Sequence, residues 1–178
     1  MSNSKKPSLK TDSNNYWEQL ERLEKLIRAS ELKAGVIFSF HGVILGLFFD
    51  RFEQIQPVFD KGIVFIILIL IWFFCVLVSI FFCFKCFRPQ IELKYEKNVL
   101  FYRDAVYAFG KVEDFSKELI KVYENEKKLF QLLSEQIHAE SKIIDQKFKS
   151  VQNAIRFFAI SFIFVVITAS IYIIATYI

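Results

Sequence analysis

The sequence predicts an all-α integral membrane protein with three transmembrane helices and a helical region between the second and third. Apolar residues make up 54% of the 178-residue chain, and they gather in three blocks with charged stretches between them. Two blocks, residues 62–84 and 157–178, carry no charged side chain. Each is long enough to cross a bilayer, because a transmembrane helix needs about 20 predominantly apolar residues. A soluble domain would not concentrate its apolar residues in this way.

The amino-terminal stretch is polar and changes character near Tyr16. Residues 1–15 are rich in Ser, Asn and Lys and are predicted to be disordered. Ser13 or Asn14 can cap a helix that begins near Tyr16. Residues 16–33 are predicted to form a cytoplasmic amphipathic helix that runs straight into the first span. Its apolar positions recur at helical spacing and are Trp17, Leu20, Leu23 and Ile27.

The first apolar block, residues 34–49, is short for a transmembrane helix. Its 16 residues would extend about 24 Å, slightly less than a typical hydrocarbon core. We interpret it as transmembrane helix 1, which pairs with transmembrane helix 2 at 62–84 as a helical hairpin. Residues 50–61 then form a periplasmic loop. The alternative is a helix that lies in the membrane interface.

The region from residue 85 to 156 is polar and predicted to be helical. Pro89 ends the helix of the second span, because proline cannot continue it. Residues 90–109 predict a short extended piece around Ile91, Leu93 and Tyr95 and a short helix, and Gly110 interrupts the pattern. From Glu113 the apolar residues keep a helical period that continues into transmembrane helix 3 at 157–178. We expect a kink or break near residues 134–142, where this period is weakest.

The distribution of Lys and Arg predicts the orientation. Seven basic residues precede the first span, and two lie in the loop 50–61. Residues 85–156 contain fourteen basic and eleven acidic residues. Because cytoplasmic flanks carry the excess of Lys and Arg, the amino terminus and 85–156 are expected in the cytoplasm, and the carboxyl terminus in the periplasm. The net charge of +4 is too diffuse for a nucleic-acid footprint and favours contact with anionic lipid or an anionic ligand.

Small residues form a stripe along the first span, and a histidine lies beside it. Gly35, Ser39, Gly42 and Gly46 follow one another at spacings of four, three and four. Helices approach closely in lipid along such stripes, either between copies of the chain or between two spans of one chain, and the pattern leaves both open. His41 lies at mid-membrane depth, where an ionisable side chain suggests function, such as lining a pore or bonding another helix. The alternative is a neutral ring bonded to a backbone carbonyl or to Ser39.

The sequence gives no support for an enzyme, a metal site or a cofactor. It has no glycine-rich phosphate loop, and no catalytic set can be assembled on one side of the membrane. Cys75, Cys83 and Cys86 lie in or beside the second span, which favours membrane or interface residues over a disulfide framework. Cys83 and Cys86 form a C-x-x-C, but no second ligand pair accompanies them.

A basic and aromatic cluster follows the second span. Aromatic rings stack on bases, and Arg or Lys neutralise phosphate, so such a cluster can hold a nucleotide. Composition alone favours a small cytoplasmic core with solvated charges. The cluster consists of Arg88, Lys94, Lys97, Phe101, Tyr102 and Arg103.

Several segments, in this order around three spans, are similar to one family. Residues 29–35 resemble its A-D-x-K-A entry to the first span, although Glu31 and a one-residue offset depart from that pattern. Arg88-Pro89 follows the second span, and residues 98–105 resemble an apolar-F-F-G-D-I stretch, with Arg103 at the glycine position. Gln136-Ile137 and Lys147-Phe148 precede the last span. Over residues 16–170 the chain resembles the membrane effectors of the Pycsar antiphage systems, the PycTM family.

The resemblance implies a function. Family members are encoded with a pyrimidine cyclase, which makes cyclic CMP or cyclic UMP on phage infection. The effector, which is expected to be a homo-oligomer, senses the cyclic pyrimidine mononucleotide and impairs the bacterial inner membrane, which causes abortive infection. Residues 85–156 would be the sensing region. The alternative is a constitutive membrane scaffold or interaction protein that binds no nucleotide.

The resemblance carries over no ligand residue position by position. Our candidates for the nucleotide are therefore chosen on charge and aromatic character: Lys33, Arg88, Tyr102 and Arg103. Our candidates for oligomerisation and the membrane change are Gly35, Ser39, His41, Gly42 and Gly46.

Overall fold

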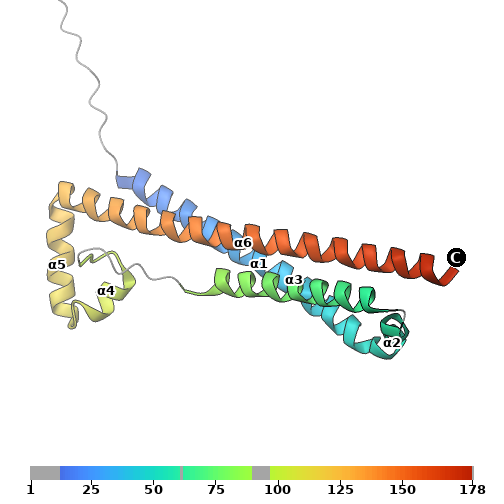
Figure 1. The fold of residues 1–178 in the computed structure, drawn as a ribbon. Coiled ribbons are helices and arrows are strands. Elements are labelled where there is room, and N and C mark those ends of the chain that lie inside the picture. The colour runs from blue at the N-terminus through green and yellow to red at the C-terminus, as the bar shows by residue number, and fades with distance from the viewer. Residues whose placement is uncertain (1–12, 61, 90–96, 178) are drawn as a thin grey trace, which may run out of the picture. The chain divides into compact units, whose positions relative to one another are not determined.

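The computed structural model describes residues 13–60, 62–89 and 97–177, and all its regular elements are helices (Figure 1). No strand occurs within these ranges. Disorder was predicted for residues 1–15; residues 1–12 lie outside the described residues, whereas residues 13–15 are helical, which contradicts the prediction there. The predicted extended piece around Ile91, Leu93 and Tyr95 also lies outside the described residues. The helices are α1 (Ser13–Asp50), α2 (Phe52–Asp60), α3 (Ile63–Phe87), α4 (Tyr102–Tyr107), α5 (Val112–Glu124) and α6 (Glu126–Tyr177).

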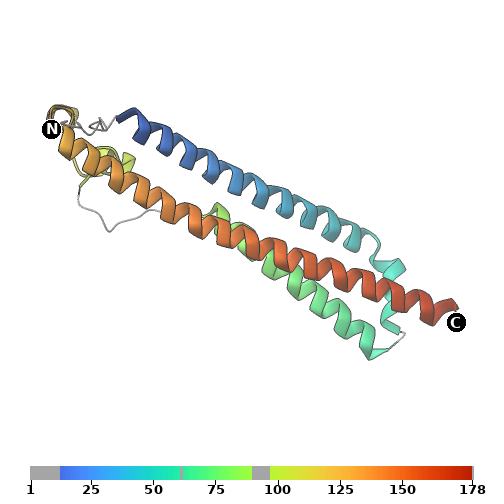
Figure 2. The same cartoon turned by 90° about the horizontal axis from the view of Figure 1, so that it is seen from above.

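Three of these helices, α1, α3 and α6, are long and apolar enough to cross a membrane. This confirms the predicted fold class, an all-α membrane protein with three spans. α1 begins at Ser13, three residues before the predicted start, and continues without interruption into the first apolar block. α1 and α3 run in opposite directions with α2 between them in the chain, as a helical hairpin requires (Figures 1 and 2). Their side chains meet at Phe38–Phe84 and Phe48–Trp72, where the ring centroids are 5.3 and 5.0 Å apart.

The predicted break in the last long helix is real, but its position was wrong. α6 is continuous through residues 134–142, and the chain instead leaves helical geometry at Asn125, where φ is −114° and ψ is 93°. The Asn125 Oδ1 accepts a hydrogen bond from the Lys128 backbone N–H at 3.1 Å. Asn125 therefore caps the amino terminus of α6, because its side chain satisfies a donor that the first turn leaves without a partner.

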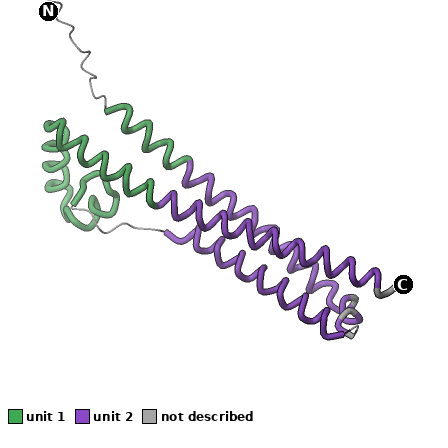
Figure 3. Tube along the Cα trace, turned by 45° about the horizontal axis from the view of Figure 1, so that its top comes forward, with its two compact units in different colours: residues 1–25, 91–142 green, residues 26–90, 143–178 purple. Residues whose placement is uncertain are grey.

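The chain forms two compact units that share the two longest helices (Figure 3). Unit 1 comprises residues 1–25 and 91–142, and unit 2 comprises residues 26–90 and 143–178. The core of unit 1 is aliphatic, and the Tyr16 ring packs beside it in a tilted contact with Phe130, with ring centroids 5.1 Å apart. Its buried members are Leu20, Val99, Val122, Leu129, Leu132 and Leu133.

Unit 2 contains the apolar parts of all three long helices. Its buried residues recur at spacings of three and four on α1 and α3 and, apart from one spacing of seven, on α6, the repeat that keeps one seam of a helix facing its neighbours. Many buried positions are small or contain sulfur, which lets the backbones approach closely. The seam residues are Ser30, Ala34, Ile37 and His41 on α1, Trp72, Val76, Ser79, Cys83 and Cys86 on α3, and Ile144, Lys147, Val151, Ala154 and Ser161 on α6.

Candidate functional site in the membrane bundle

A chain of hydrogen bonds connects the three long helices of unit 2. The Ser79 hydroxyl of α3 donates to the Ala154 carbonyl of α6 at 2.8 Å. Its oxygen also lies 2.8 Å from the His41 Nε2 of α1. A serine hydroxyl has one proton, which Ala154 already receives, so Ser79 can only accept from the histidine. His41 is therefore protonated on Nε2, and the three residues form one three-helix clamp.

The other nitrogen of the His41 ring has no hydrogen-bond partner. The side chain is fully buried, and its Nδ1 is without a donor or acceptor partner. The ring packs edge-on against Phe158 of α6 with centroids 5.1 Å apart. His41 thus bonds another helix, one of the two predicted roles. Ser39, the partner considered in the alternative, instead donates to its own helix at the Gly35 carbonyl.

A buried lysine forms the second polar contact of unit 2. Lys147 of α6 is 4% exposed, and its ammonium lies 2.8 Å from a Glu31 carboxylate oxygen and 2.5 Å from the Cys86 carbonyl oxygen. Cys86 is in the last turn of α3, where carbonyls lack helical partners and the helix dipole favours a cation. Lys147 therefore neutralises the partial negative charge at the carboxyl end of α3 and, with the same ammonium group, forms an ion pair with α1.

Neither Lys147 nor Ser79 was predicted from the sequence to be a site residue. Lys147 lies 116 residues from Glu31, a separation that local patterns do not detect. A signal was present, because Lys147 occupies a seam position of α6 that is otherwise small or apolar. A charged residue at such a position is buried only with a partner.

The predicted small-residue stripe faces away from this seam. A Cβ atom added at Gly42 or Gly46 would meet no atom within 4 Å, and one at Gly35 would approach only the Phe87 ring, at 3.9 Å. Gly42, Gly46 and Ser39 are exposed on the surface of unit 2. The stripe therefore does not pack closely against the second span, and the face of α1 used inside the chain is that of Ser30, Ala34, Ile37 and His41.

The four candidate nucleotide residues are divided between the two units. In unit 2, Lys33 lies over the Phe148 ring at 5.9 Å from its centroid, and Arg88 is exposed after the end of α3. In unit 1, Tyr102 is 71% exposed at the start of α4 and Arg103 is half-buried beside it. Neither unit holds all four.

Asn98 holds the segment before α4 in unit 1. Its buried side chain donates to the Leu132 carbonyl of α6 at 3.0 Å and accepts from the Leu100 N–H at 2.9 Å. Its own N–H donates to an Asp104 carboxylate oxygen at 2.9 Å. These bonds fix the backbone immediately before Tyr102 and Arg103, and thereby the position at which α4 begins.

The three cysteines are free thiols in the apolar packing of α3. Cys83 and Cys86 are fully buried among small and aliphatic side chains, and Cys75 is buried about two turns earlier on the same helix. Among the described residues no group of three His, Cys, Asp or Glu side chains is arranged to hold a metal ion. The C-x-x-C pair contributes to helix packing.

These features define a class of protein: a small all-helical membrane protein whose three spans are joined by buried polar contacts. A family model, that of the Pycsar effector protein domain PycTM, matches residues 15–174. The chain therefore belongs to the PycTM family of Pycsar effectors, as its resemblance had indicated. No curated protein and no solved structure matches it.

Proposed function

We propose that this protein is an antiphage effector that senses a cyclic pyrimidine mononucleotide, cyclic CMP or cyclic UMP, and then impairs the bacterial inner membrane. The observation that carries the proposal is the family match, which includes all three spans and the region between them. A partner pyrimidine cyclase would supply the ligand. The effector itself would act without catalysis, and abortive infection would follow. We propose the orientation that the distribution of Lys and Arg predicts. The amino terminus and unit 1 would then be cytoplasmic, and the carboxyl terminus would be periplasmic.

The exposed Tyr102 ring and the adjacent Arg103 support a role of unit 1 in binding. An exposed aromatic ring offers a stacking surface for a pyrimidine base, and a guanidinium binds phosphate through paired N–H donors. Lys33 and Arg88 are two further cationic side chains, both in unit 2. We propose that these four residues contribute to nucleotide recognition.

The response of the membrane requires a second state of the spans. A ligand shifts an equilibrium only by its difference in affinity for the two states. The clamp of His41, Ser79 and Ala154 would stabilise the resting state of the bundle. We propose that nucleotide binding favours an assembled state in which copies associate along Gly35, Ser39, Gly42 and Gly46 and in which the bilayer leaks.

The direct test is ion leakage from proteoliposomes. Purified protein is reconstituted in vesicles with a potential-sensitive dye, and cyclic CMP, cyclic UMP, cyclic AMP or cyclic GMP is added on the cytoplasmic side. We expect depolarisation with a pyrimidine nucleotide and none with the purine controls. A protein that binds no cyclic nucleotide and never depolarises the vesicles would instead be the constitutive scaffold.

Binding is tested separately by calorimetry with single alanine variants at Lys33, Arg88, Tyr102 and Arg103. Tyr107→Ala is the matched control for Tyr102→Ala, because Tyr107 is also on α4 and is 78% exposed. Loss of affinity at Tyr102 with retention at Tyr107 would support unit 1 as the sensing region. Equal affinities in all five variants would remove these residues from the site.

A further inference from the structure

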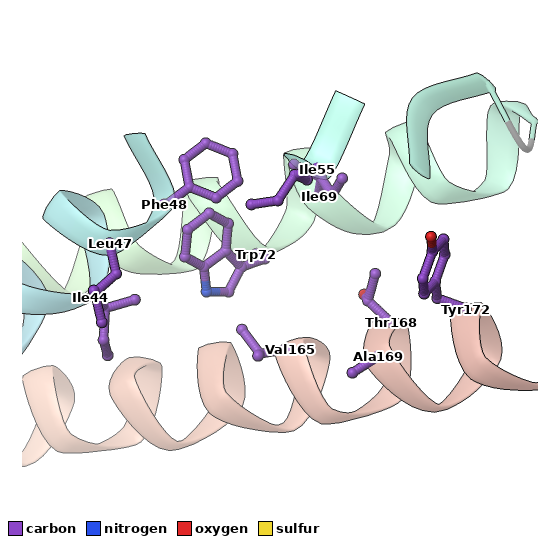
Figure 4. Close-up of a pocket in the computed structure, with 10 residues that line it drawn as sticks. All are labelled: Ile44, Leu47, Phe48, Ile55, Ile69, Trp72, Val165, Thr168, Ala169 and Tyr172. Atoms are coloured by element: carbon purple, nitrogen blue, oxygen red, sulfur yellow. The ribbon is translucent and has the colours of Figure 1, made fainter. Parts of the chain in front are cut away.

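The membrane bundle of unit 2 contains an open apolar groove that the proposed function does not use. It lies between α1, α3 and α6, with Ile55 of α2 beside it, and has a volume of about 350 Å³ (Figure 4). Side chains from both sides point into it, among them Phe48, Trp72 and Val165. The Phe48 and Trp72 rings form one wall, with centroids 5.0 Å apart.

The lining carries no charge and very little polarity. Its polar atoms belong to Trp72, Thr168 and Tyr172, and the Thr168 hydroxyl already donates to the Phe164 carbonyl at 2.7 Å. A nucleotide or another charged ligand would find no counter-charge here and would lose its hydration. Water is also a poor occupant, because a buried water needs two to four polar partners.

The size and the surroundings of the groove identify its occupant. Nine of the ten lining residues belong to the three spans, so the groove opens toward hydrocarbon. An α-helix with its side chains is about 10–12 Å across and rises about 5.4 Å per turn, so a single turn would occupy roughly 400 Å³ or more, which exceeds the volume of the groove. An unfilled groove would lose the dispersion contacts that close packing provides. We propose that it is a binding site for one acyl chain of a membrane phospholipid.

Trp72 allows this proposal to be tested directly. Trp72 lines the groove and is otherwise buried, with 6% of the residue exposed, and Trp17 is the other tryptophan of the chain. In a Trp17→Phe background, all indole fluorescence comes from Trp72. The protein is reconstituted in phosphatidylcholine vesicles in which an increasing fraction of lipid carries bromine midway along one acyl chain, because bromine quenches indole on contact.

Two matched pairs of variants separate a bound chain from the surrounding lipid. Ala169→Phe fills the groove, whereas Ala159→Phe makes the same change at an exposed position outside its lining. Val165→Phe and Val166→Phe form a second pair on the same helix, which keeps the test decisive if Ala169→Phe does not fold.

We expect Trp72 quenching to saturate at a low fraction of brominated lipid. Most of it should be lost in Ala169→Phe and Val165→Phe and retained in the two controls. Quenching that rises in proportion to the brominated fraction, with no difference within either pair, would mean ordinary contact with surrounding lipid and would overturn the proposal. Absence of quenching would also overturn it, because the groove would then be closed to lipid or covered by protein. None of these outcomes depends on nucleotide binding.

Discussion

The Lys147 ammonium of α6 lies 2.8 Å from the Glu31 carboxylate of α1, and the two side chains differ strongly in exposure. That of Lys147 is 4% exposed and that of Glu31 is 40% exposed. Removal of either partner therefore leaves a different residue behind. Loss of the lysine leaves a carboxylate that water can reach, whereas loss of the carboxylate leaves a buried cation with one neutral carbonyl, that of Cys86.

Substitution at this pair should therefore be asymmetric. Glu31→Gln should lower the free energy of unfolding by about 2–4 kcal/mol, because a buried charge without its partner is costly. Lys147→Met keeps the volume and removes the charge, so it should cost less, about 0–2 kcal/mol. Thermal unfolding in detergent micelles, followed by circular dichroism, measures both.

The exposed pair Lys149–Asp145 on the same helix is the control, with a separation of 2.6 Å and side chains 69% and 59% exposed. Asp145→Asn should change stability by about 0–1 kcal/mol. An equal effect of Glu31→Gln and Asp145→Asn would show that burial of Lys147 does not determine the stability of the bundle.

The contact between His41 and Ser79 predicts a measurable coupling between two spans. Hydrogen bonds between transmembrane helices contribute about 0.6 kcal/mol on average and up to about 1.7 kcal/mol. A double-mutant cycle with His41→Phe and Ser79→Ala should give a coupling energy in this range. Ser170→Ala is the control, because the Ser170 hydroxyl bonds only its own helix, at the Val166 carbonyl. Additive effects of the two substitutions would contradict the clamp.

Hydropathy was sufficient to locate the three spans, but it did not identify the contacts between them. Residues 62–84 carry no charge and have the length of a transmembrane helix, which satisfies every backbone polar group within the segment itself. The partner of His41 is 38 residues away and that of Lys147 is 116 residues away. Pairings at such separations depend on which helix faces meet, and the prominent glycine stripe indicated a different face of α1 from the one that packs.

The missed helix boundary at Asn125 has a local cause and leads to a prediction. Asn125→Ala removes the side-chain acceptor for the Lys128 N–H and should destabilise the chain by about 0.5–2 kcal/mol. Asn125→Asp keeps an acceptor at the same position and should restore most of the loss. Hydrogen exchange of the Lys128 amide should accelerate in the alanine variant alone. Equal exchange in both variants would contradict the cap.

Glu140 of unit 1 predicts a dependence of stability on pH. Burial raises its pKa above the ordinary value of 4.5, the Gln136 side chain lowers it, and the nearby Glu24 raises it further. Its Oε2 atom is buried without a hydrogen-bond partner. Because the folded chain holds this proton more tightly than the unfolded chain does, its contribution to stability is complete below pH 4.5 and is lost as the pH rises through the folded pKa.

Glu140→Gln, which cannot ionise, should therefore be more stable than the natural protein at pH 7, and the difference should shrink as the pH falls below 4.5. Unfolding by denaturant across this range measures it. Glu18→Gln is the control, because Glu18 is exposed on α1, and it should show a much smaller difference at every pH. A gain of stability that does not vary with pH would assign the effect to packing instead.

The open face of Gly42 and Gly46 predicts a separation of folding from membrane damage. A Cβ atom added at either position meets no atom within 4 Å, and isoleucine is a better helix former than glycine, so Gly42→Ile and Gly46→Ile should insert and unfold like the natural protein. If copies associate along this face, both variants should lose nucleotide-dependent depolarisation and chemical cross-linking between copies. Ala159→Ile adds similar bulk at an exposed position of α6 and should retain both activities. Depolarisation that persists in the glycine variants would exclude the stripe from the mechanism, since a face that must approach another helix closely cannot accept two branched side chains.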